Sequence, residues 1–496
     1  MADTGVMIGF SDHIEQLLLN RANRHGLVAG ATGTGKTVTL QILAQGFSDA
    51  GVPVFAADVK GDLSGISTIG TPNEKMLARA AAMNLEIKPA AAPTVFWDLF
   101  GEAGHPIRAT VSEMGPLLIS RMLELNDVQE GVLSVVFRAA DEEGLLLLDL
   151  KDLQAALAHA AENAKDLSAR YGNISPATIA TIQRGLLVLE DQGGTHLFGE
   201  PALQLSDIMR TDPSGKGYIN LLAANKLIAN PRLYATFLLW LMSELFEELP
   251  EIGDPDKPRL VFFFDEAHLL FRDAPKPLLE KVEQVVRLIR SKGVGVYFIT
   301  QNPADIPDTV LGQLGNRIQH ALRAYTPADQ RGLRAASDSF RPNPAFDTAE
   351  AIQALGVGEA LVSVLDERGA PTVVQKTMIR PPNSRMGPAL PAERAALMGQ
   401  SPVRGLYDTA LDRDSAFEVL QKARAAATAA VEAAEPEVDE EPARRAPAPR
   451  GSSRQGMGET FAKSMLRTIG SQVGRELIRG VLGGLLGASR PARRRR

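Results

Sequence analysis

The feature that most constrains this chain is a stretch near its start that fits the P-loop pattern G-x-x-x-x-G-K-[ST] at every fixed position. It reads Gly30-Ala31-Thr32-Gly33-Thr34-Gly35-Lys36-Thr37. The short apolar run 25–29 before it predicts a buried strand, and the apolar spacing of residues 37–47 after it predicts a helix. A strand, a glycine-rich turn and a helix in this order form the setting that a phosphate-binding loop needs.

The residue types in this loop suit the binding of phosphate groups. Glycines let successive backbone N–H groups converge on phosphate oxygens without clashes from Cβ atoms. The N-terminus of the following helix adds the positive end of its dipole. We therefore expect residues 30–37 to bind the nucleotide, Lys36 to reach the β- and γ-phosphates, and the Thr37 hydroxyl to ligate Mg²⁺. The alternative is a glycine-rich turn that binds nothing.

A second signal lies far downstream, where the apolar run 260–264 ends in Asp265 and Glu266. Such a run predicts a buried strand that delivers two carboxylates to the edge of a sheet, which is the Walker B arrangement. We expect Asp265 to hold the Mg²⁺ shell, directly or through water. Glu266 is expected to orient and polarise the attacking water as a general base. We expect His268 to be structural rather than catalytic.

Polar residues also follow the predicted strand at 52–57. Asp58 ends this strand, and the loop after it carries Lys60 and Asp62. In parallel sheets, ligands lie beyond the carboxyl ends of the strands. At least one of these three residues is therefore expected to act on the phosphate or metal side; the alternative is that they cap the next helix.

The predicted strand at 293–299 runs into Thr300 and Gln301. A polar side chain in this position, beside the Walker B strand, can sense the γ-phosphate, and we assign that role to Gln301. The alternative is an ordinary hydrogen-bonding residue at the end of a strand.

Three arginines are candidates for a finger that a neighbouring subunit would place on the developing charge of a transferred phosphoryl group. They are Arg290, Arg317 and Arg323, and we choose Arg317, which begins a strand-like stretch at 316–323. The alternative for each arginine is a surface or salt-bridge residue.

Composition limits the other chemistries. The chain has 496 residues, a formal net charge of −6 and no cysteine. The absence of cysteine excludes disulfides, thiolate zinc sites and cysteine nucleophiles, and it fits a reducing cytoplasm. The acidic mean does not favour nucleic-acid binding over the whole surface, although a local basic channel stays open. We find neither a secretory signal nor an apolar run long enough for a transmembrane helix.

Pattern and composition divide the chain into six segments. Helical spacing of apolar residues from about 112 to 197 predicts an all-helical insertion in an α/β core, and residues 14–19 are expected to form a short helical lead-in. The predicted segments are 1–110, the first part of the core with the P-loop; 111–200, the helical insertion; 201–380, the second part of the core; 381–434, extended and then helical; 435–456, a disordered linker; and 457–496, a glycine-rich amphipathic helix with a basic tail.

The final helix has three possible roles: docking between subunits or to a protein partner, attachment to a membrane surface, and contact with nucleic acid. We favour them in that order, because its glycines permit close helix contact while its polar face carries few charges for a membrane anchor.

Four stretches, GATGTGKT, DVKGDL, FFFDEAH and RSKGVGVYFITQNP, resemble the HerA/FtsK superfamily of hexameric P-loop ATPases. With NRHGLVAGATGTGKTVTL, LGQLGNRIQHALRA and the glycine-rich tail, the chain is most similar to the bacterial HerA-like C-terminal-domain family of the YjgR type. The resemblance runs from about residue 20 to residue 380 and again over the last part of the tail.

This resemblance implies a RecA-like core with a mainly parallel sheet, assembly into a ring, and ATP hydrolysis at subunit interfaces. It assigns nucleotide binding to residues 30–37, the metal and water roles to Asp265 and Glu266, and the sensor role to Gln301. HerA proteins carry a β-barrel ahead of the P-loop that docks a nuclease, and FtsK-type relatives carry transmembrane helices there. Neither precedes Gly30 in this sequence, so we do not expect nuclease docking or membrane transport.

The sequence thus predicts a cytoplasmic, Mg²⁺-dependent ATPase that forms a hexameric ring and threads a polymer, with duplex DNA as the expected one. One alternative is a nucleotide-switched interaction protein that recruits a partner through its C-terminal helix and does not move nucleic acid. A small-molecule kinase is a weaker alternative, because we find no acceptor-binding motif and an Asp-Glu pair suits water as the acceptor.

Overall fold

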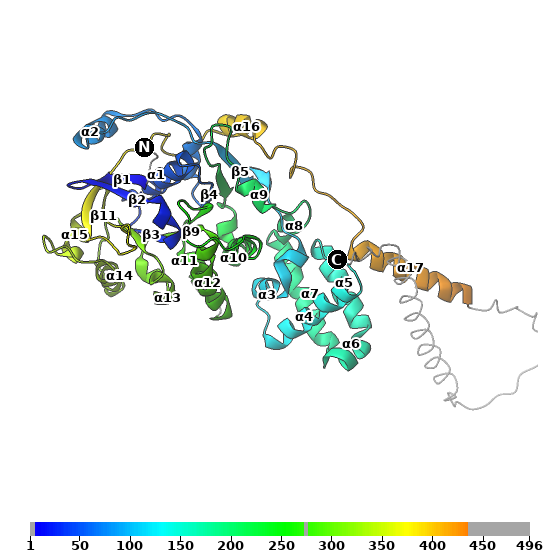
Figure 1. Ribbon diagram of the computed structural model, residues 1–496. Helices are drawn as coiled ribbons and strands as arrows, with labels where there is room; N and C mark the ends of the chain where they lie inside the picture. Colours follow the sequence, from blue (N-terminus) through cyan, green and yellow to red (C-terminus); the bar gives the residue numbers. More distant parts are fainter. Residues whose placement is uncertain (1–4, 272–275, 435–496) are drawn as a thin grey trace, which may run out of the picture. The chain divides into compact units, whose positions relative to one another are not determined.

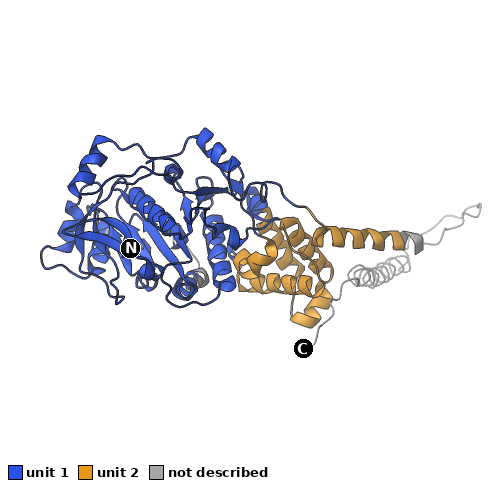
Figure 2. Cartoon of the chain, turned by 45° about the horizontal axis from the view of Figure 1, so that its top comes forward, with its two compact units in different colours: residues 1–109, 121–124, 189–411 blue, residues 110–120, 125–188, 412–496 orange. Residues whose placement is uncertain are grey.

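The computed structural model describes residues 5–271 and 276–434, which separate into two compact units (Figure 2). Apart from residues 272–275, unit 1 holds residues 5–109, 121–124 and 189–411, and unit 2 holds residues 110–120, 125–188 and 412–434. The predicted linker at 435–456 and the predicted amphipathic helix at 457–496 lie outside the described residues.

Within the described residues, unit 1 is built on one twelve-stranded sheet (Figure 1). Its order is β2-β1-β12-β11-β10-β3-β9-β8-β4-β7-β5-β6, and the eight strands from β10 to β6 are parallel. The strands are β1 (Gly5–Phe10), β2 (Ile14–Leu18), β3 (Gly26–Ala29), β4 (Val54–Asp58), β5 (Thr94–Asp98), β6 (His105–Pro106), β7 (Ile219–Ala223), β8 (Leu260–Phe264), β9 (Val294–Thr300), β10 (Asn316–Gln319), β11 (Glu359–Ser363) and β12 (Gln375–Ile379). The predicted α/β core with a mainly parallel sheet is confirmed.

The sequence explains why the parallel strands lie in the middle of the core. Both faces of a parallel sheet are covered, so its strands are continuous apolar runs rather than alternating ones. Every residue of β3, β4, β8 and β9 is buried. On β8, Phe262 stacks on Phe55 of β4, and Phe264 stacks on Phe298 of β9. These rings fill the interior and fix the strands whose ends carry the polar residues.

Helices connect the strands of unit 1. The long helix α1 follows β3 directly and packs against β1, β3 and β4. The α-helices of this unit are α1 (Lys36–Asp49), α2 (Glu74–Ala82), α8 (Gly194–Leu197), α9 (Leu205–Ile208), α10 (Pro231–Glu248), α11 (His268–Phe271), α12 (Lys276–Ile289), α13 (Asp308–Leu311), α14 (Pro327–Asp338), α15 (Thr348–Ala354) and α16 (Pro391–Gly399). Short 3₁₀ turns are η1 (Leu19–Arg24), η2 (Asp62–Ser67), η3 (Leu227–Ala229), η4 (Arg290–Lys292) and η5 (Pro303–Asp305).

The described part of unit 2 is helical, as the apolar spacing predicts. Its helices are α4 (Asp127–Glu142), α5 (Leu150–Glu162), α6 (Ala164–Tyr171), α17 (Ala416–Ala434), most of α3 (Val111–Met122) and most of α7 (Pro176–Asp191). Helix α5 packs against α4, α6 and α17. Within the described ranges, no helix of either unit is both long and apolar enough to cross a membrane.

One local prediction is wrong. Residues 14–18 form strand β2 rather than a helical lead-in, and they pair with β1 in an antiparallel hairpin. Their side chains alternate between exposed and buried, with Leu17 fully covered. In a run this short, the spacing of Ile14, Leu17 and Leu18 fits a helix or a strand, and the pairing with β1 decides it.

Candidate nucleotide-binding site

The P-loop joins the end of β3 to the start of α1, and its glycines adopt backbone angles that other residues avoid. Gly30, Gly33 and Gly35 have φ values of 149°, 77° and 117°. A Cβ atom on Gly30 would lie 2.6 Å from Cβ of His320, so only glycine fits there. The loop ends at the N-terminus of α1, with Gly35 as the N-cap residue, and an anion there gains from the helix dipole.

Hydrogen bonds to both neighbouring strands hold this loop. The Gly30 N–H donates to the Thr300 carbonyl at the end of β9 over 3.3 Å, and the Ala31 N–H donates to the Ala321 carbonyl after β10 over 2.8 Å. Lys36 Nζ donates to the carbonyls of Gly30 and Ala31 over 2.6 and 3.0 Å. The ammonium group of Lys36 therefore lies against the P-loop, where it is predicted to contact the phosphates.

His320 packs against the P-loop, and the sequence analysis did not identify it as a site residue. Its ring is fully buried, its Nδ1 lies 3.0 Å from the Glu359 carbonyl, and its Nε2 lies 2.9 Å from the Thr39 hydroxyl. Burial lowers the pKa of His320 to about 4, so the ring is neutral and can donate through Nδ1 while accepting at Nε2. The signal available in the sequence was its place just after a strand beside the P-loop strand.

The acidic pair follows β8. Asp265 and Glu266 come directly after the three buried phenylalanines of that strand. Glu266 has a φ of 50°, a left-handed conformation that non-glycine residues adopt rarely and mostly at functional sites. The Tyr234 hydroxyl of α10 donates to the Asp265 carbonyl over 3.0 Å. The turn that orients the two carboxylates is therefore fixed from the neighbouring helix.

Side chains that follow two neighbouring strands contact Glu266, and one of them also reaches the P-loop. Lys60, in the loop after β4, places Nζ 2.9 Å from Glu266 Oε1. Gln301, after β9, places Nε2 3.3 Å from Glu266 Oε2, and its Oε1 lies 3.4 Å from the Thr32 hydroxyl of the P-loop. Gln301 thus bridges the phosphate-binding loop and the acidic pair. The structure brings the two distant motifs together at one edge of the sheet.

The electrostatics agree with this proximity. Burial, and then the charge of Glu266, raise the pKa of Asp265 to about 7. Burial, and then the charge of Lys60, lower the pKa of Lys36, whereas Glu266 and Asp265 act in the opposite direction. Burial also opposes ionisation of Glu266, but the hydrogen bond and charge of Lys60, with Gln301, outweigh it and lower the pKa of Glu266. The charges of Lys36, Lys60, Asp265 and Glu266 therefore lie close enough to change one another's pKa values.

These residues fit a magnesium ion that is shared with phosphates. Mg²⁺ is held in nucleotide sites by one or two protein oxygens together with phosphate oxygens and water. Asp265 is a half-buried carboxylate whose charged form a nearby cation favours, and Thr37 is the second residue of α1, directly after the P-loop lysine. In the described ranges no cluster of three His, Asp or Glu residues could hold a metal by itself.

The polar residues at the end of β4 and in the loop after it differ in what they contact. Asp58 is buried, and burial raises its pKa to about 6, while the backbone N–H groups of Gly61 and Leu63 favour its charged form. Asp58 therefore braces the start of η2, as a capping residue does. Asp62 is the first residue of η2. Of the three polar residues predicted near the nucleotide, Lys60 is the one that contacts the acidic pair.

The structure does not bring Arg317 to this cluster. Its guanidinium donates to the carbonyls of Leu311 and Leu314 over 3.0 Å each, and also to the Ser339 carbonyl. Arg323 donates to the Gln353 carbonyl over 2.6 Å, and Arg290 is exposed in η4. A trans role for Arg317 stays a prediction, and it would require these three hydrogen bonds to break.

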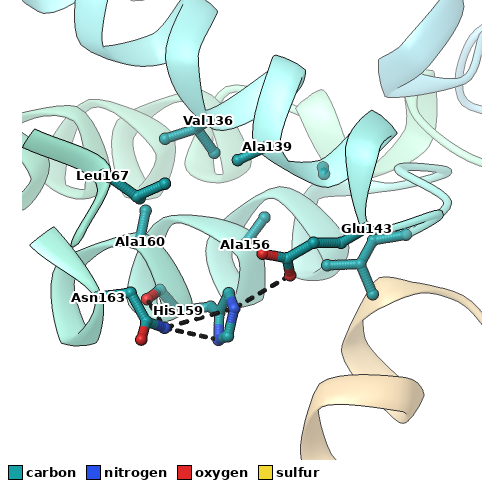
Figure 3. Close-up of a pocket in the computed structure, with 10 residues that line it drawn as sticks. Val136, Ala139, Glu143, Ala156, His159, Ala160, Asn163 and Leu167 are labelled. Atoms are coloured by element: carbon teal, nitrogen blue, oxygen red, sulfur yellow. Dashed lines mark hydrogen bonds and ion pairs between the residues drawn. The ribbon is translucent and has the colours of Figure 1, made fainter. Parts of the chain in front are cut away.

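Unit 2 offers a pocket of a different kind (Figure 3). It is lined by Val136, Ala139, Ala140, Glu143, Leu145, Ala156, His159, Ala160, Asn163 and Leu167. Its volume is about 20 Å³, room for about one water molecule. The polar contact at its edge joins His159 Nε2 to Glu143 Oε2 over 3.2 Å. This pocket is too small for a nucleotide.

The sheet order and the site define the class of protein. One strand, β9, separates the P-loop strand β3 from the acidic strand β8, and its end carries the polar residue that bridges them. A P-loop, an acidic pair and a glutamine that bridges them at the carboxyl edge of one parallel sheet define a P-loop nucleoside triphosphatase with a RecA-like core.

Comparison with known families places the chain within this class. Residues 8–491 match the family model described as "Helicase HerA-like C-terminal". Because this match covers almost the whole chain, the protein belongs to the HerA-like helicase C-terminal family, and the resemblance inferred from the sequence is confirmed.

Curated relatives are distant. The DNA double-strand break repair helicase HerA of Sulfolobus acidocaldarius is 24% identical over 378 residues, which cover 72% of this chain and 66% of that protein. A probable helicase of Methanocaldococcus jannaschii is 30% identical over 125 residues, which cover 24% of this chain and 22% of that protein. The chain therefore spans less than two thirds of the length of either relative.

Similar solved structures include a bacterial conjugative coupling protein and a VirB4 protein. The bacterial conjugative coupling protein TrwB has a TM-score of 0.48 and 16% identity, with 79% of this chain and 92% of that chain covered. VirB4 of Thermoanaerobacter pseudethanolicus has a TM-score of 0.47 and 14% identity, with 79% of this chain and 98% of that chain covered.

Proposed function

We propose that the protein hydrolyses ATP with Mg²⁺ and works as a cytoplasmic, ring-forming motor, hexameric as its family resemblance implies, that moves or remodels duplex DNA. The observation that carries the hydrolysis is the cluster of Lys36, Lys60, Glu266 and Gln301 at the carboxyl edge of the sheet. Support for DNA as the polymer comes from the family and from the Sulfolobus relative, which is named as a DNA double-strand break repair helicase.

The reaction assigns one task to each side chain. Water attacks the γ-phosphorus in line, the bond to the β–γ bridging oxygen breaks, and ADP, phosphate and a proton result. Glu266 holds the water and accepts its proton. The N–H groups of residues 32–37 and the Lys36 ammonium stabilise the negative charge that moves onto the phosphate oxygens. Thr37 and Asp265 would hold Mg²⁺, which neutralises the β- and γ-phosphates when bound.

Gln301 is placed to report the state of the phosphate. It contacts both the P-loop hydroxyl of Thr32 and the Glu266 carboxylate. A γ-phosphate held on the loop would lie beside this amide, and its loss after hydrolysis would free the amide to shift along β9. In a ring, such a shift is the local event that neighbouring subunits could read.

A second function is favoured by the ion pair of Lys60 with Glu266. A general base engaged by an ammonium group at 2.9 Å is not free to take a proton from water. If Lys60 keeps this contact after ATP binds, hydrolysis is slow, and the protein acts as a nucleotide-switched assembly or interaction protein that does not move nucleic acid.

One experiment separates the two functions. ATP turnover by the full chain is measured with and without duplex DNA, alongside its native mass with ADP and with a non-hydrolysable ATP analogue. The motor predicts turnover that rises with duplex DNA and a ring-sized mass. Turnover that duplex DNA leaves unchanged, together with a mass that depends on the nucleotide, supports the switch and contradicts the motor.

A further inference from the structure

A short loop borders the P-loop on the flank opposite the acidic pair. It comprises residues 355–358, between α15 and β11. The Gly358 N–H donates to the Thr34 carbonyl of the P-loop over 3.1 Å. A Cβ atom on Gly35 would lie 3.5 Å from the Gly358 Cα, an ordinary contact distance. The loop at 355–358 is therefore packed directly against the phosphate cradle.

Arg79 of α2 fixes the shape of this loop. Its guanidinium donates to the Gly358 carbonyl over 2.7 Å and to the Val357 carbonyl over 3.1 Å. The Gly358 carbonyl also accepts from the Ile379 N–H of β12 over 2.9 Å. Gly358 has a φ of 77°, a conformation that glycine supplies without strain. The backbone around Val357 is thus held from a helix and a strand.

The side chain of Val357 is presented outward from this fixed loop. It is 72% exposed, although valine is an apolar residue. A single exposed apolar side chain needs no explanation by itself. Here, however, the side chain sits on a rigid backbone next to a loop that the sequence devotes to phosphates. An apolar contact beside an anion cradle is what the non-phosphate part of a nucleotide requires.

The sheet order gives the direction in which a bound nucleotide would run. Strand β3 lies between β9 and β10, and β11 lies beyond β10. Glu266, Gln301 and Lys60 mark the β9 side of the P-loop, which is where the γ-phosphate must meet water. The base must therefore leave the loop toward the other flank, where β10, β11 and the loop at 355–358 lie (Figure 1).

We propose that Val357 and the loop at 355–358 form the subsite for the base of the nucleotide, with the apolar side chain against one face of a purine ring. This subsite rests on the proposed function, because it requires the triphosphate to bind residues 30–37. Purine rings are flat and weakly hydrated on their faces, so contact with valine removes apolar surface from water.

The test uses inorganic tripolyphosphate, which has the charged part of ATP and lacks the base. Binding of ATP and of tripolyphosphate, each with Mg²⁺, is measured by calorimetry on the full chain. Val357→Ser is expected to weaken ATP binding about fivefold, as the loss of a small apolar contact implies, and to leave tripolyphosphate binding unchanged. Val128→Ser is the matched control, because Val128 is 68% exposed on α4 of unit 2.

A second variant works in the opposite direction and supplies its own signal. Val357→Trp is expected to tighten ATP binding about tenfold through stacking of the base on the indole. The two natural tryptophans, Trp97 and Trp240, are buried at 0% and 2% exposure, so the introduced indole dominates the solvent-sensitive fluorescence. ATP should quench this fluorescence and tripolyphosphate should not.

Three results overturn the proposal in distinguishable ways. If tripolyphosphate binds but the ratio of ATP to tripolyphosphate affinity is the same in the natural protein, Val357→Ser and Val357→Trp, the base lies elsewhere and the proposed function stands. If neither ligand binds the natural protein, the phosphate cradle itself fails, and the base subsite fails with it. A change in native mass on Val357→Ser without a change in ATP affinity would assign the side chain to a contact between subunits instead.

Discussion

The two units of this protein use charged residues in opposite ways. In unit 1, Lys60 after β4 and Gln301 after β9 contact Glu266, and burial, followed by the charge of Glu266, raises the pKa of the neighbouring Asp265 to about 7. In unit 2, a buried carboxylate holds two helices together. Asp152 of α5 accepts hydrogen bonds from the backbone N–H groups of Leu148 and of Phe417 in α17 over 2.9 Å each.

This difference teaches where to look for chemistry. A carboxylate whose hydrogen-bonding capacity is filled by backbone donors stabilises a fold and has nothing left for a substrate. A carboxylate that is partly removed from water beside another carboxylate is held in an unfavourable state, which a magnesium nucleotide would relieve. The helical unit follows the first pattern, and the P-loop edge follows the second.

The largest expected effect comes from exchanging one lysine in each unit. Lys36→Ala removes the ammonium group over the P-loop, and we expect ATP turnover to fall on the order of a hundredfold or more, as loss of one preorganised charge donor does. Lys151 contacts Asp412 and Glu418 at 2.8 and 3.0 Å within unit 2, and Lys151→Ala should leave turnover unchanged. Equal losses in both variants would contradict the division of roles; steady-state phosphate release measures them.

The second effect concerns the stability of unit 2. Asp152 is fully buried and also accepts from the Ser415 hydroxyl, which ties α5 to the start of α17. Asp152→Ala leaves several buried donors without an acceptor, so the free energy of unfolding should fall by about 3 kcal/mol. Urea unfolding followed by hydrogen exchange in α5 and α17 measures this loss. ATP binding to the folded variant serves as the control and should stay as in the natural protein.

The smallest effect is a pH dependence that separates the units. His25 in unit 1 accepts from the Val296 N–H at Nδ1 over 3.0 Å, so its Nε2–H donates to the Val286 carbonyl over 2.7 Å and the ring is neutral. Burial lowers the pKa of His25 to about 4 from an ordinary 6.5. The unfolded chain therefore binds the proton more readily, and the contribution of His25 to the stability of unit 1 falls by about 1.4 kcal/mol per pH unit as the pH drops from about 6.5 toward 4.

Unit 2 should respond later on acidification. Although burial acts against it, hydrogen bonds from Ser415 and Lys151 lower the pKa of Glu418 to about 2 from an ordinary 4.5. Its contribution to stability is present above pH 4.5 and is lost only as the pH falls below that value. Hydrogen exchange at pH 7 and pH 5.5, corrected for intrinsic rates, should show lower protection in β3 and β9 but not in α5. Equal changes in both units would contradict this order.

The sequence predicted those parts of the site in which the residue types themselves determine the local backbone conformation. The P-loop needs glycine at positive φ, and the acidic strand needs an unbroken apolar run, so both are visible locally. The sequence could not show which residue of 58–62 contacts the acidic pair, because the choice of Lys60 depends on the placement of β4 beside β8. For the same reason it did not identify His320 or the loop at 355–358.

Unit 2 shows the limit of periodic patterns. Helical spacing predicted its helices but not that residues 412–434, placed in a separate C-terminal segment, would pack with α5. Such packing depends on contacts between residues far apart in the chain, such as Asp152 with Phe417. The short strand β2 was mispredicted because its pairing with β1, rather than its spacing, determines its structure.

The central claim is that the lysine-bearing loop and the acidic pair act on one bound triphosphate. The most direct test compares Glu266→Gln with the natural protein in a single-turnover experiment, with ATP binding measured on the same samples. The account predicts ATP affinity within about twofold of the natural protein and a hydrolysis rate lower by a factor on the order of a hundred to ten thousand, as loss of a general base implies. A variant that binds and hydrolyses ATP at the natural rate would contradict it.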